Sequence, residues 1–157
     1  MNIKLIVVAK TDAAYLQEGI ALYEKRLRHY AGFEMVVIPA LKDTKNLDIQ
    51  EIKQREGQLL LRQMERCDRL ILLDEHGKKF TSMAFADHLQ RQMNAGVRNL
   101  GFVVGGAYGF SEAVYAAAHE RISLSDMTFN HQMVRLFFVE QLYRAFTILH
   151  HEPYHNE

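Results

Sequence analysis

Short apolar runs alternate along the chain with longer segments in which apolar residues recur every three or four positions. Residues 3–9 are apolar at nearly every position, which is typical of a strand covered on both faces. Tyr15, Leu16, Ile20 and Tyr23 then recur at helical spacing. Repeated along the chain, the pattern predicts strands at 3–9, 33–39, 68–78, 97–106 and 121–125, and helices at 12–32, 49–65, 81–93, 111–119 and 132–149. Asp12 is a candidate cap of the first helix, and the third strand is expected to run into a turn at Gly77.

This alternation of strands and helices predicts an α/β protein with a doubly wound parallel sheet. A chain of 157 residues is the length of one domain, so we expect residues 1–157 to form a single unit. Ligands of such sheets bind beyond the carboxyl ends of the strands. The segments expected to meet there are 73–78, 105–109 and 123–130.

The amino-acid composition bears on the binding partners and on the cellular compartment of the protein. Nineteen basic residues balance nineteen acidic ones, whereas a simple nucleic-acid-binding protein carries a basic surplus. A single cysteine excludes an intramolecular disulfide and fits a reducing compartment. The chain lacks an apolar run of the roughly 20 residues that a membrane helix needs, and its start reads as a strand and not as a signal peptide. We therefore predict a cytoplasmic protein with no membrane partner.

Glycines cluster where the fourth predicted strand ends, in the stretch VVGGAYGFSEAV that begins at Val103. Gly105, Gly106 and Gly109 allow either a tight strand-to-helix turn or a ligand that lies against bare main chain. The spacing matches neither GxGxxG nor a Walker A loop. Such a turn would suit a ligand with an adenosine-like body and little negative charge.

The stretch LSDMTFNHQMVR, which begins at Leu124, also allows two interpretations. In one it is a loop in which Asn130 caps the last helix and His131 occupies the first turn. In the other it lines a small-molecule pocket, because the apolar Met127 and Phe129 flank polar donors.

The last predicted helix is apolar nearly all round, with a core face of Phe137, Leu142, Phe146 and Leu149. A homodimer interface would explain so much apolar surface on a terminal helix, and deep packing within one chain is the alternative explanation. Polar residues of the helix either pair with one another or reach a substrate: Arg135, Glu140 and Arg144. The histidine-rich tail HHEPYHNE matches no named metal-ligand spacing, so we predict no metal.

Seven segments together resemble one family: YEKRL at 23–27, REG at 55–57, LLDEHGK at 72–78, VVGGAYG at 103–109, SLSDMTFNHQMVR at 123–135, EQLYRAF at 140–146 and PYH at 153–155. The chain resembles the RlmH family, the small SPOUT-class methyltransferases of the bacterial large-subunit ribosomal RNA. The resemblance spans almost the whole chain. It departs from the family pattern at Glu75–His76 and at Asn130, where prolines would stand.

The resemblance implies a SPOUT-type parallel sheet with helices on both faces and a C-terminal trefoil knot. It implies a homodimer that transfers a methyl group from S-adenosylmethionine to N3 of a pseudouridine in large-subunit ribosomal RNA within the ribosome. By the same motifs, the cofactor would contact Leu73, Gly105, Leu124, Ser125, Asp126, Met127, Thr128 and Phe129.

Catalytic roles then follow as hypotheses. The acceptor nitrogen must lose a proton, and His131 and His155 are candidates to remove or orient it. Arg135 and Arg144 could hold a phosphate or the developing oxyanion. Tyr154 could stack on the base, so that Arg144, Tyr154 and His155 would bind substrate. A flavodoxin-like nucleotide-binding protein and a non-enzymatic ribosome-associated factor are the alternative functions.

Overall fold

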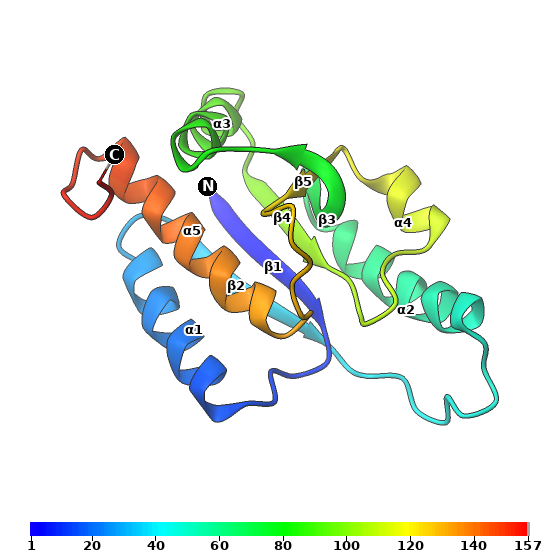
Figure 1. Ribbon diagram of the computed structural model, residues 1–157. Coiled ribbons are helices and arrows are strands. Elements are labelled where there is room, and N and C mark those ends of the chain that lie inside the picture. Colours follow the sequence, from blue (N-terminus) through cyan, green and yellow to red (C-terminus); the bar gives the residue numbers. More distant parts are fainter. Residues whose placement is uncertain (157) are drawn as a thin grey trace.

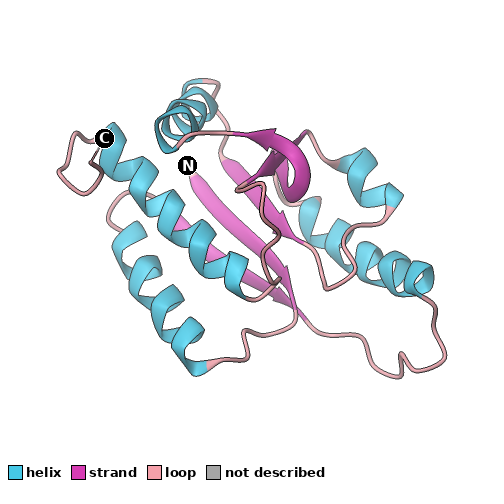
Figure 2. Ribbon diagram, in the orientation of Figure 1, coloured by secondary structure: helices cyan, strands magenta, loops and turns pink. Residues whose placement is uncertain are grey.

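A five-stranded parallel sheet forms the centre of the computed structural model, which describes residues 1–156 (Figures 1 and 2). The strand order is β2-β1-β4-β3-β5, and every adjacent pair is parallel. The strands are β1 (Asn2–Val8), β2 (Gly32–Ile38), β3 (Arg69–Lys79), β4 (Asn99–Val104) and β5 (Glu120–Ser123). The predicted α/β class with a parallel sheet is confirmed.

Helices cover both faces of the sheet. Three of them pack on one face and two on the other (Figure 1). The first group comprises α1 (Ala14–Leu27), α3 (Ser82–Asn94) and α5 (Met133–Leu149), and the second α2 (Ile49–Met64) and α4 (Glu112–Ala117). Asp48, Thr81 and Ser111 begin three of these helices, because each side chain accepts a main-chain N–H of the first turn.

Strand β1 shows why both faces are covered. Ile3, Leu5 and Val7 pack into the core under α1, α3 and α5, whereas Ile6 and Val8 pack into the core under α2 and α4. All five side chains are buried. A strand whose alternate residues are buried on opposite sides needs a nearly continuous apolar run, as the sequence has here.

The third strand does not end in a turn at Gly77, as the sequence suggested. It continues to Lys79 with a shift in register to β5 between Leu73 and Lys78. A Cβ at position 77 would stand 2.6 Å from main-chain atoms of Arg121 and Ile122. Glycine at position 77 therefore allows β3 and β5 to approach each other closely.

Two predictions about the helices are also wrong. Asp12 does not cap α1, which begins after Ala13 without a side-chain cap, and the main-chain N–H of Asp12 instead donates to Gln132 Oε1 at 2.9 Å. Phe137, predicted on the core face of α5, is 43% exposed, and 37% of Met133 is exposed too, so deep packing within one chain does not account for the apolar surface of this helix. The neighbouring Phe138 is the residue that enters the core.

Within residues 1–156, none of the helices combines the length and the apolar character that crossing a bilayer requires.

Candidate active site

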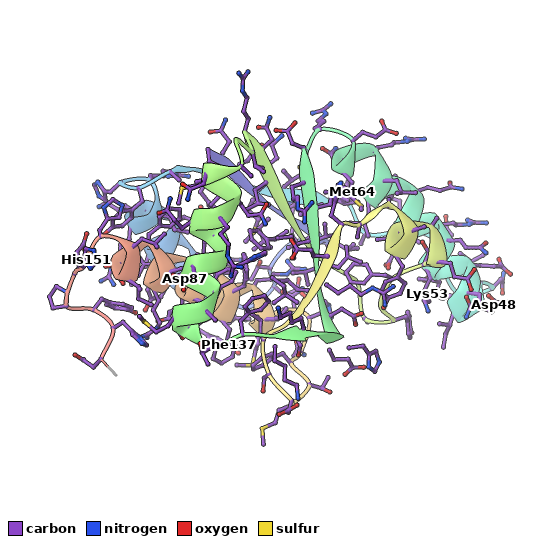
Figure 3. All side chains as sticks on the ribbon, turned by 90° about the horizontal axis from the view of Figure 1, so that it is seen from above. Asp48, Lys53, Met64, Asp87, Phe137 and His151 are labelled. Atoms are coloured by element: carbon purple, nitrogen blue, oxygen red, sulfur yellow. The ribbon has the colours of Figure 1, made fainter. Side chains whose placement is uncertain are left out.

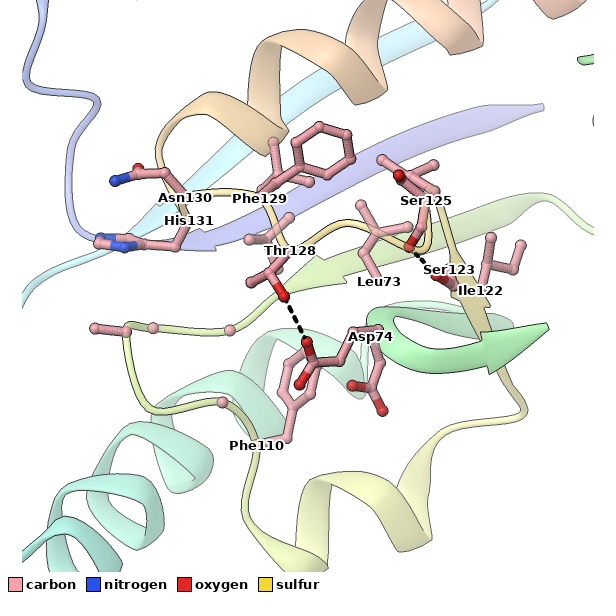
Figure 4. Close-up of a pocket in the computed structure, with 18 of the residues that line it drawn as sticks. Leu73, Asp74, Phe110, Ile122, Ser123, Ser125, Thr128, Phe129, Asn130 and His131 are labelled. Carbon is pink, nitrogen blue, oxygen red and sulfur yellow. Dashed lines mark hydrogen bonds between the residues drawn. The ribbon is translucent and has the colours of Figure 1, made fainter. Parts of the chain in front are cut away.

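A pocket of about 410 Å³ lies beyond the carboxyl ends of β3, β4 and β5 (Figure 4). Three segments enclose it, and they are those that the parallel-sheet rule placed together. The lining comprises residues 73–75, 104–110, 122–125, 127–131 and 134. Leu73, Gly105 and most of the loop after β5 therefore meet in one place, as expected from the sequence.

The glycine turn forms one wall of the pocket. The main-chain N–H of Gly109 donates to the carbonyl of Gly106 at 3.1 Å, and Gly109 has a φ of +86°, which favours glycine. A Cβ on Gly105 would come within 3.2–3.3 Å of Phe110 and of the Gly109 main chain. The tight-turn interpretation is therefore correct, and the turn also presents bare main chain to the pocket.

Short hydrogen bonds shape the loop between β5 and α5 on the opposite wall. The Ser123 hydroxyl donates to the carbonyl of Ser125 at 2.8 Å, and the Met127 N–H donates to the Ser125 hydroxyl at 3.0 Å. Thr128 Oγ1 donates to Glu75 Oε2 at 3.0 Å, which joins this loop to the end of β3 (Figure 4). Both walls are thus held in place largely by local bonds.

Asp126 differs from its neighbours in this loop. Its carboxylate forms an ion pair with Lys79 and is largely exposed. It does not line the pocket, whereas the residues on either side do. Of the predicted contacts to the cofactor, the Asp126 side chain is the one that the structure places elsewhere.

The charge around the pocket is negative. Asp74 and Glu75 line it, and within the described chain the lining includes neither lysine nor arginine. Burial raises the pKa of Tyr115 behind Asp74, and the Asp74 carboxylate raises it further. Such a site attracts a cation and disfavours a phosphate-bearing ligand.

His131 lines the pocket where the loop enters α5 (Figure 4). It is partly buried, and its carbonyl accepts a hydrogen bond from Arg135 Nε at 3.2 Å. The Asn130 side chain accepts the N–H of Gln132 at 2.7 Å, which turns the chain into the helix. The histidine therefore occupies a fixed position at the edge of the pocket.

The structure does not bring Arg135 to the pocket. The side chain is fully buried, and burial lowers its pKa. Its terminal nitrogens donate to the carbonyls of Val8 at 2.6 Å and Ala9 at 2.8 Å, and to Thr11 Oγ1 at 3.1 Å. Arg135 therefore connects the end of β1 to α5, and it is not among the residues that line the pocket.

The remaining predicted site residues, Arg144, Tyr154 and His155, lie with Tyr23 and Glu140 in a second cluster further along α5. We call these five residues the tail cluster. Glu140 Oε1 accepts from Arg144 at 2.6 Å and from the Tyr154 hydroxyl at 2.9 Å. Arg144 Nη1 lies 3.1 Å from His155 Nδ1, and the Tyr23 and Tyr154 hydroxyls lie 3.4 Å apart. Burial and these hydrogen bonds raise the pKa of Tyr154.

The tail cluster and the pocket lie at different positions along one helix. Val134, which lines the pocket, and Arg144 are ten residues apart on α5, which at 1.5 Å each is roughly 15 Å. Figure 3 labels Phe137 near the pocket end of α5 and His151 beyond the other end. None of Arg144, Tyr154 and His155 lines the pocket of its own chain.

Proteins of similar sequence identify the family of this chain. The model of the family described as "Predicted SPOUT methyltransferase" matches residues 1–155. The chain belongs to the SPOUT methyltransferase family. A protein of Parabacteroides distasonis is 57% identical over 157 residues, which is the full length of both chains, and one of Flavobacterium johnsoniae is 55% identical over the same span. Both relatives are named "Ribosomal RNA large subunit methyltransferase H".

Solved structures support the SPOUT fold at low sequence identity. A "Probable Methyltransferase" from Bordetella pertussis Tohama I has a TM-score of 0.55 and 13% identity, covering 92% of this chain and 95% of its own. TrmJ from Z. mobilis ZM4 has a TM-score of 0.51 and 11% identity, covering 92% of this chain and 70% of its own. The expected SPOUT-type sheet is therefore confirmed.

Sequence reasoning missed some lining residues of this SPOUT pocket. Phe110, Ile122 and Val134 read as ordinary core positions in the sequence, and the first two are indeed almost fully buried. Tyr23 fits the helical spacing of its segment and stands in YEKRL, and neither pattern carries a chemical signal. In the region that the structure describes, no group of three or more His, Cys, Asp or Glu is arranged to hold a metal ion.

Proposed function

We propose that this chain transfers a methyl group from S-adenosylmethionine to N3 of a pseudouridine in large-subunit ribosomal RNA, acting on the assembled ribosome. The observation that carries the proposal is the pocket, which has bare main chain on one wall, carboxylates on another and no basic side chain among its described lining residues. The SPOUT family supplies the reaction class, and the names of the relatives supply the substrate class.

The residues present fit this cofactor. A volume of about 410 Å³ lies within the range of small-molecule sites. Leu73, Phe110 and Ile122 offer apolar surface to an adenine ring, and Glu75 offers negative charge to a cation. When bound, the cofactor supplies an electrophilic methyl group on a positively charged sulfur. Leu73, Gly105 and residues 124–129 would hold it, with Asp126 contributing only main chain because its carboxylate pairs with Lys79.

The C-terminal trefoil knot is part of the proposal. Family membership favours it, since the resemblance places the knot in the segment that carries the loop after β5. The Gln132 side chain accepts the N–H of Asp12 and donates to the carbonyl of Lys10 at 3.1 Å, so the end of this loop is bonded to the connection between β1 and α1. Proteolysis of the native chain followed by tracing of a crystal structure would test the threading.

We also propose a homodimer with a shared active site. Met127, Phe129, Met133 and Phe137 place apolar surface beside the pocket, and the rings of Phe129 and Phe137 stack at 4.8 Å. Contiguous exposed apolar surface of this kind favours association. Because Arg144, Tyr154 and His155 do not line the pocket of their own chain, a second copy is the simplest source of these residues for the pocket.

The two histidines receive different roles in this proposal. Arginine cannot accept a hydrogen bond, so His155 Nδ1 accepts from Arg144 and the neutral ring carries its proton on Nε2. We assign His155 an orienting role, because its hydrogen bond with Arg144 holds the guanidinium in place. His131, on the pocket itself, is left as the candidate to remove the proton of the acceptor nitrogen.

Mass spectrometry of large-subunit ribosomal RNA tests the proposed function. A strain that lacks the gene is expected to lose one methyl group on one pseudouridine, and the wild-type chain supplied in trans is expected to restore it. Calorimetry with S-adenosylhomocysteine separates the alternatives. Binding of a flavin nucleotide in its place, or of ribosomes with no small-molecule ligand, would contradict the proposal.

A further inference from the structure

Glu56 lies on α2, outside the pocket lining, and packs against the back of the glycine turn. A Cβ on residue 106 would stand 2.5 Å from Glu56 Oε1 and 2.9 Å from Oε2. Gly106 also lines the pocket. Glycine at position 106 therefore leaves the space that the Glu56 carboxylate occupies, and the carboxylate lies directly behind the turn.

The residue after Glu56 makes a second close contact with the same segment. A Cβ on Gly57 would collide with the hydroxyl of Ser111. That hydroxyl accepts the N–H of Val114 at 3.3 Å and begins α4. The pair Glu56–Gly57 thus packs closely against both ends of the segment 106–111, against Gly106 at one end and the Ser111 side chain at the other.

Stability does not explain a glutamate at this position. Glu56 Oε1 is buried and has no hydrogen-bond partner among the described residues. Burial accordingly raises the pKa of Glu56. A buried carboxylate oxygen without a donor costs free energy, so the residue is not accounted for as a stabilising contact of the folded chain.

We propose that Glu56 is a positioning residue of the methyl-donor pocket, and that its side chain supports the turn 105–109 from behind in the shape that lines the pocket. The inference rests on the proposed function, because it assigns the turn to the methyl-donor site. Glu56 acts through Gly106 and touches neither donor nor substrate. The bulk of the side chain provides the support, and its charge is not required.

A double-mutant cycle on S-adenosylhomocysteine affinity tests this coupling. Gly106→Ala should weaken binding about tenfold, because the new Cβ collides with the Glu56 carboxylate and displaces the turn. In the Glu56→Ala background, the same substitution should cost no more than about threefold. Glu56→Ala alone should weaken binding about three- to fivefold, since the turn loses its support.

Two further variants complete the design. Glu56→Gln keeps the bulk of the side chain and should bind within about twofold of wild type. Gly109→Ala is the matched control, because a Cβ there meets nothing within 4 Å and any loss comes from its φ of +86°. That loss should be the same whether or not residue 56 is alanine. Glu56→Asp, which also withdraws the carboxylate from residue 106, replaces Glu56→Ala in the cycle if the alanine variant does not fold.

Affinities are measured per folded chain, with thermal unfolding recorded separately without ligand. A residue with only a structural role would change the unfolding temperature and leave the affinity unaltered. The inference is overturned if Glu56→Ala binds as wild type does, or if the cost of Gly106→Ala is equal in both backgrounds. Failure of the wild-type chain to bind S-adenosylhomocysteine would instead overturn the proposed function.

Discussion

Two candidate sites lie along α5 and differ in construction. The pocket at the start of the helix is built from main chain, apolar walls and short bonds within loops. The tail cluster, further along the helix, consists of ionisable side chains bonded to one another, with Glu140 accepting from both Arg144 and Tyr154. A site made of main chain depends on the fold that holds it, whereas a site made of side chains depends on each member. The two should therefore respond to mutation in different ways.

The largest expected effect is on the stability of the folded chain, through Arg135, which connects the end of β1 to α5. Arg135→Met removes donors that serve the carbonyls of Val8 and Ala9, and leaves those groups buried without partners. The free energy of unfolding should fall by about 3–5 kcal/mol. Chemical denaturation measures the change. Arg28→Met, at an exposed position of the α1 end, is the control and should stay within about 0.5 kcal/mol of wild type.

In the tail cluster, loss of one side chain should remove catalysis and spare the pocket. Arg144→Ala breaks the contacts to Glu140 and His155, so the rate of methyl transfer should fall about 100-fold. Affinity for S-adenosylhomocysteine, measured by calorimetry, should stay within about twofold of wild type. Equal losses of rate and affinity would show that the pocket and the tail cluster are not separate sites.

A smaller effect is expected where the two walls of the pocket meet. Thr128→Val keeps the shape of the side chain and removes its hydrogen bond to Glu75. The affinity for S-adenosylhomocysteine should fall about fivefold, as loss of about 1 kcal/mol predicts. Calorimetry on the variant checks this. An unchanged affinity would mean that the bond between the walls does not shape the pocket.

The smallest expected effect concerns pH and Glu56. Burial raises the pKa of this carboxyl above its ordinary value of 4.5. The stability it contributes is therefore fully present below about pH 4.5 and is lost as the pH rises through the folded-state pKa. Glu56→Gln should unfold at a slightly higher temperature than wild type at pH 7, and the gap should close as the pH falls to 4.5 and below. Scanning calorimetry across this range measures both; a gap independent of pH would contradict the account.

The sequence predicted the elements and their meeting point well, because burial on both faces of β1 and helical spacing in α1 leave direct patterns. It misplaced residues whose role depends on distant contacts. Arg135 looked like a free cation beside a candidate loop, and only the packed structure shows it buried against Val8 and Ala9. Gly77 looked like a turn because the approach of β5 leaves no local signal.

The parts of the candidate site that follow from the topology of a parallel sheet could be predicted from the sequence. The parts that depend on distances between residues far apart in the chain could not. Gly105 and Thr128 follow β4 and β5, Leu73 pairs with the last residue of β4, and the carboxyl ends of parallel strands share one edge of the sheet. His131 and His155 were assigned to one reaction on residue type alone. No sequence pattern states that His155 folds back against Arg144, away from the pocket that His131 lines.

A mixed dimer gives the most direct test that the pocket of one copy works with the tail of another. One chain would carry Arg144→Ala, and the other Gly105→Val, whose side chain would crowd Phe110 and the Gly109 main chain in the pocket. Each variant alone should be inactive in methyl transfer to ribosomes. Mixed in equal amounts, they should regain about a quarter of wild-type activity, because half of the dimers are mixed and each then has one complete site. A mixture as inactive as its parents would contradict the account.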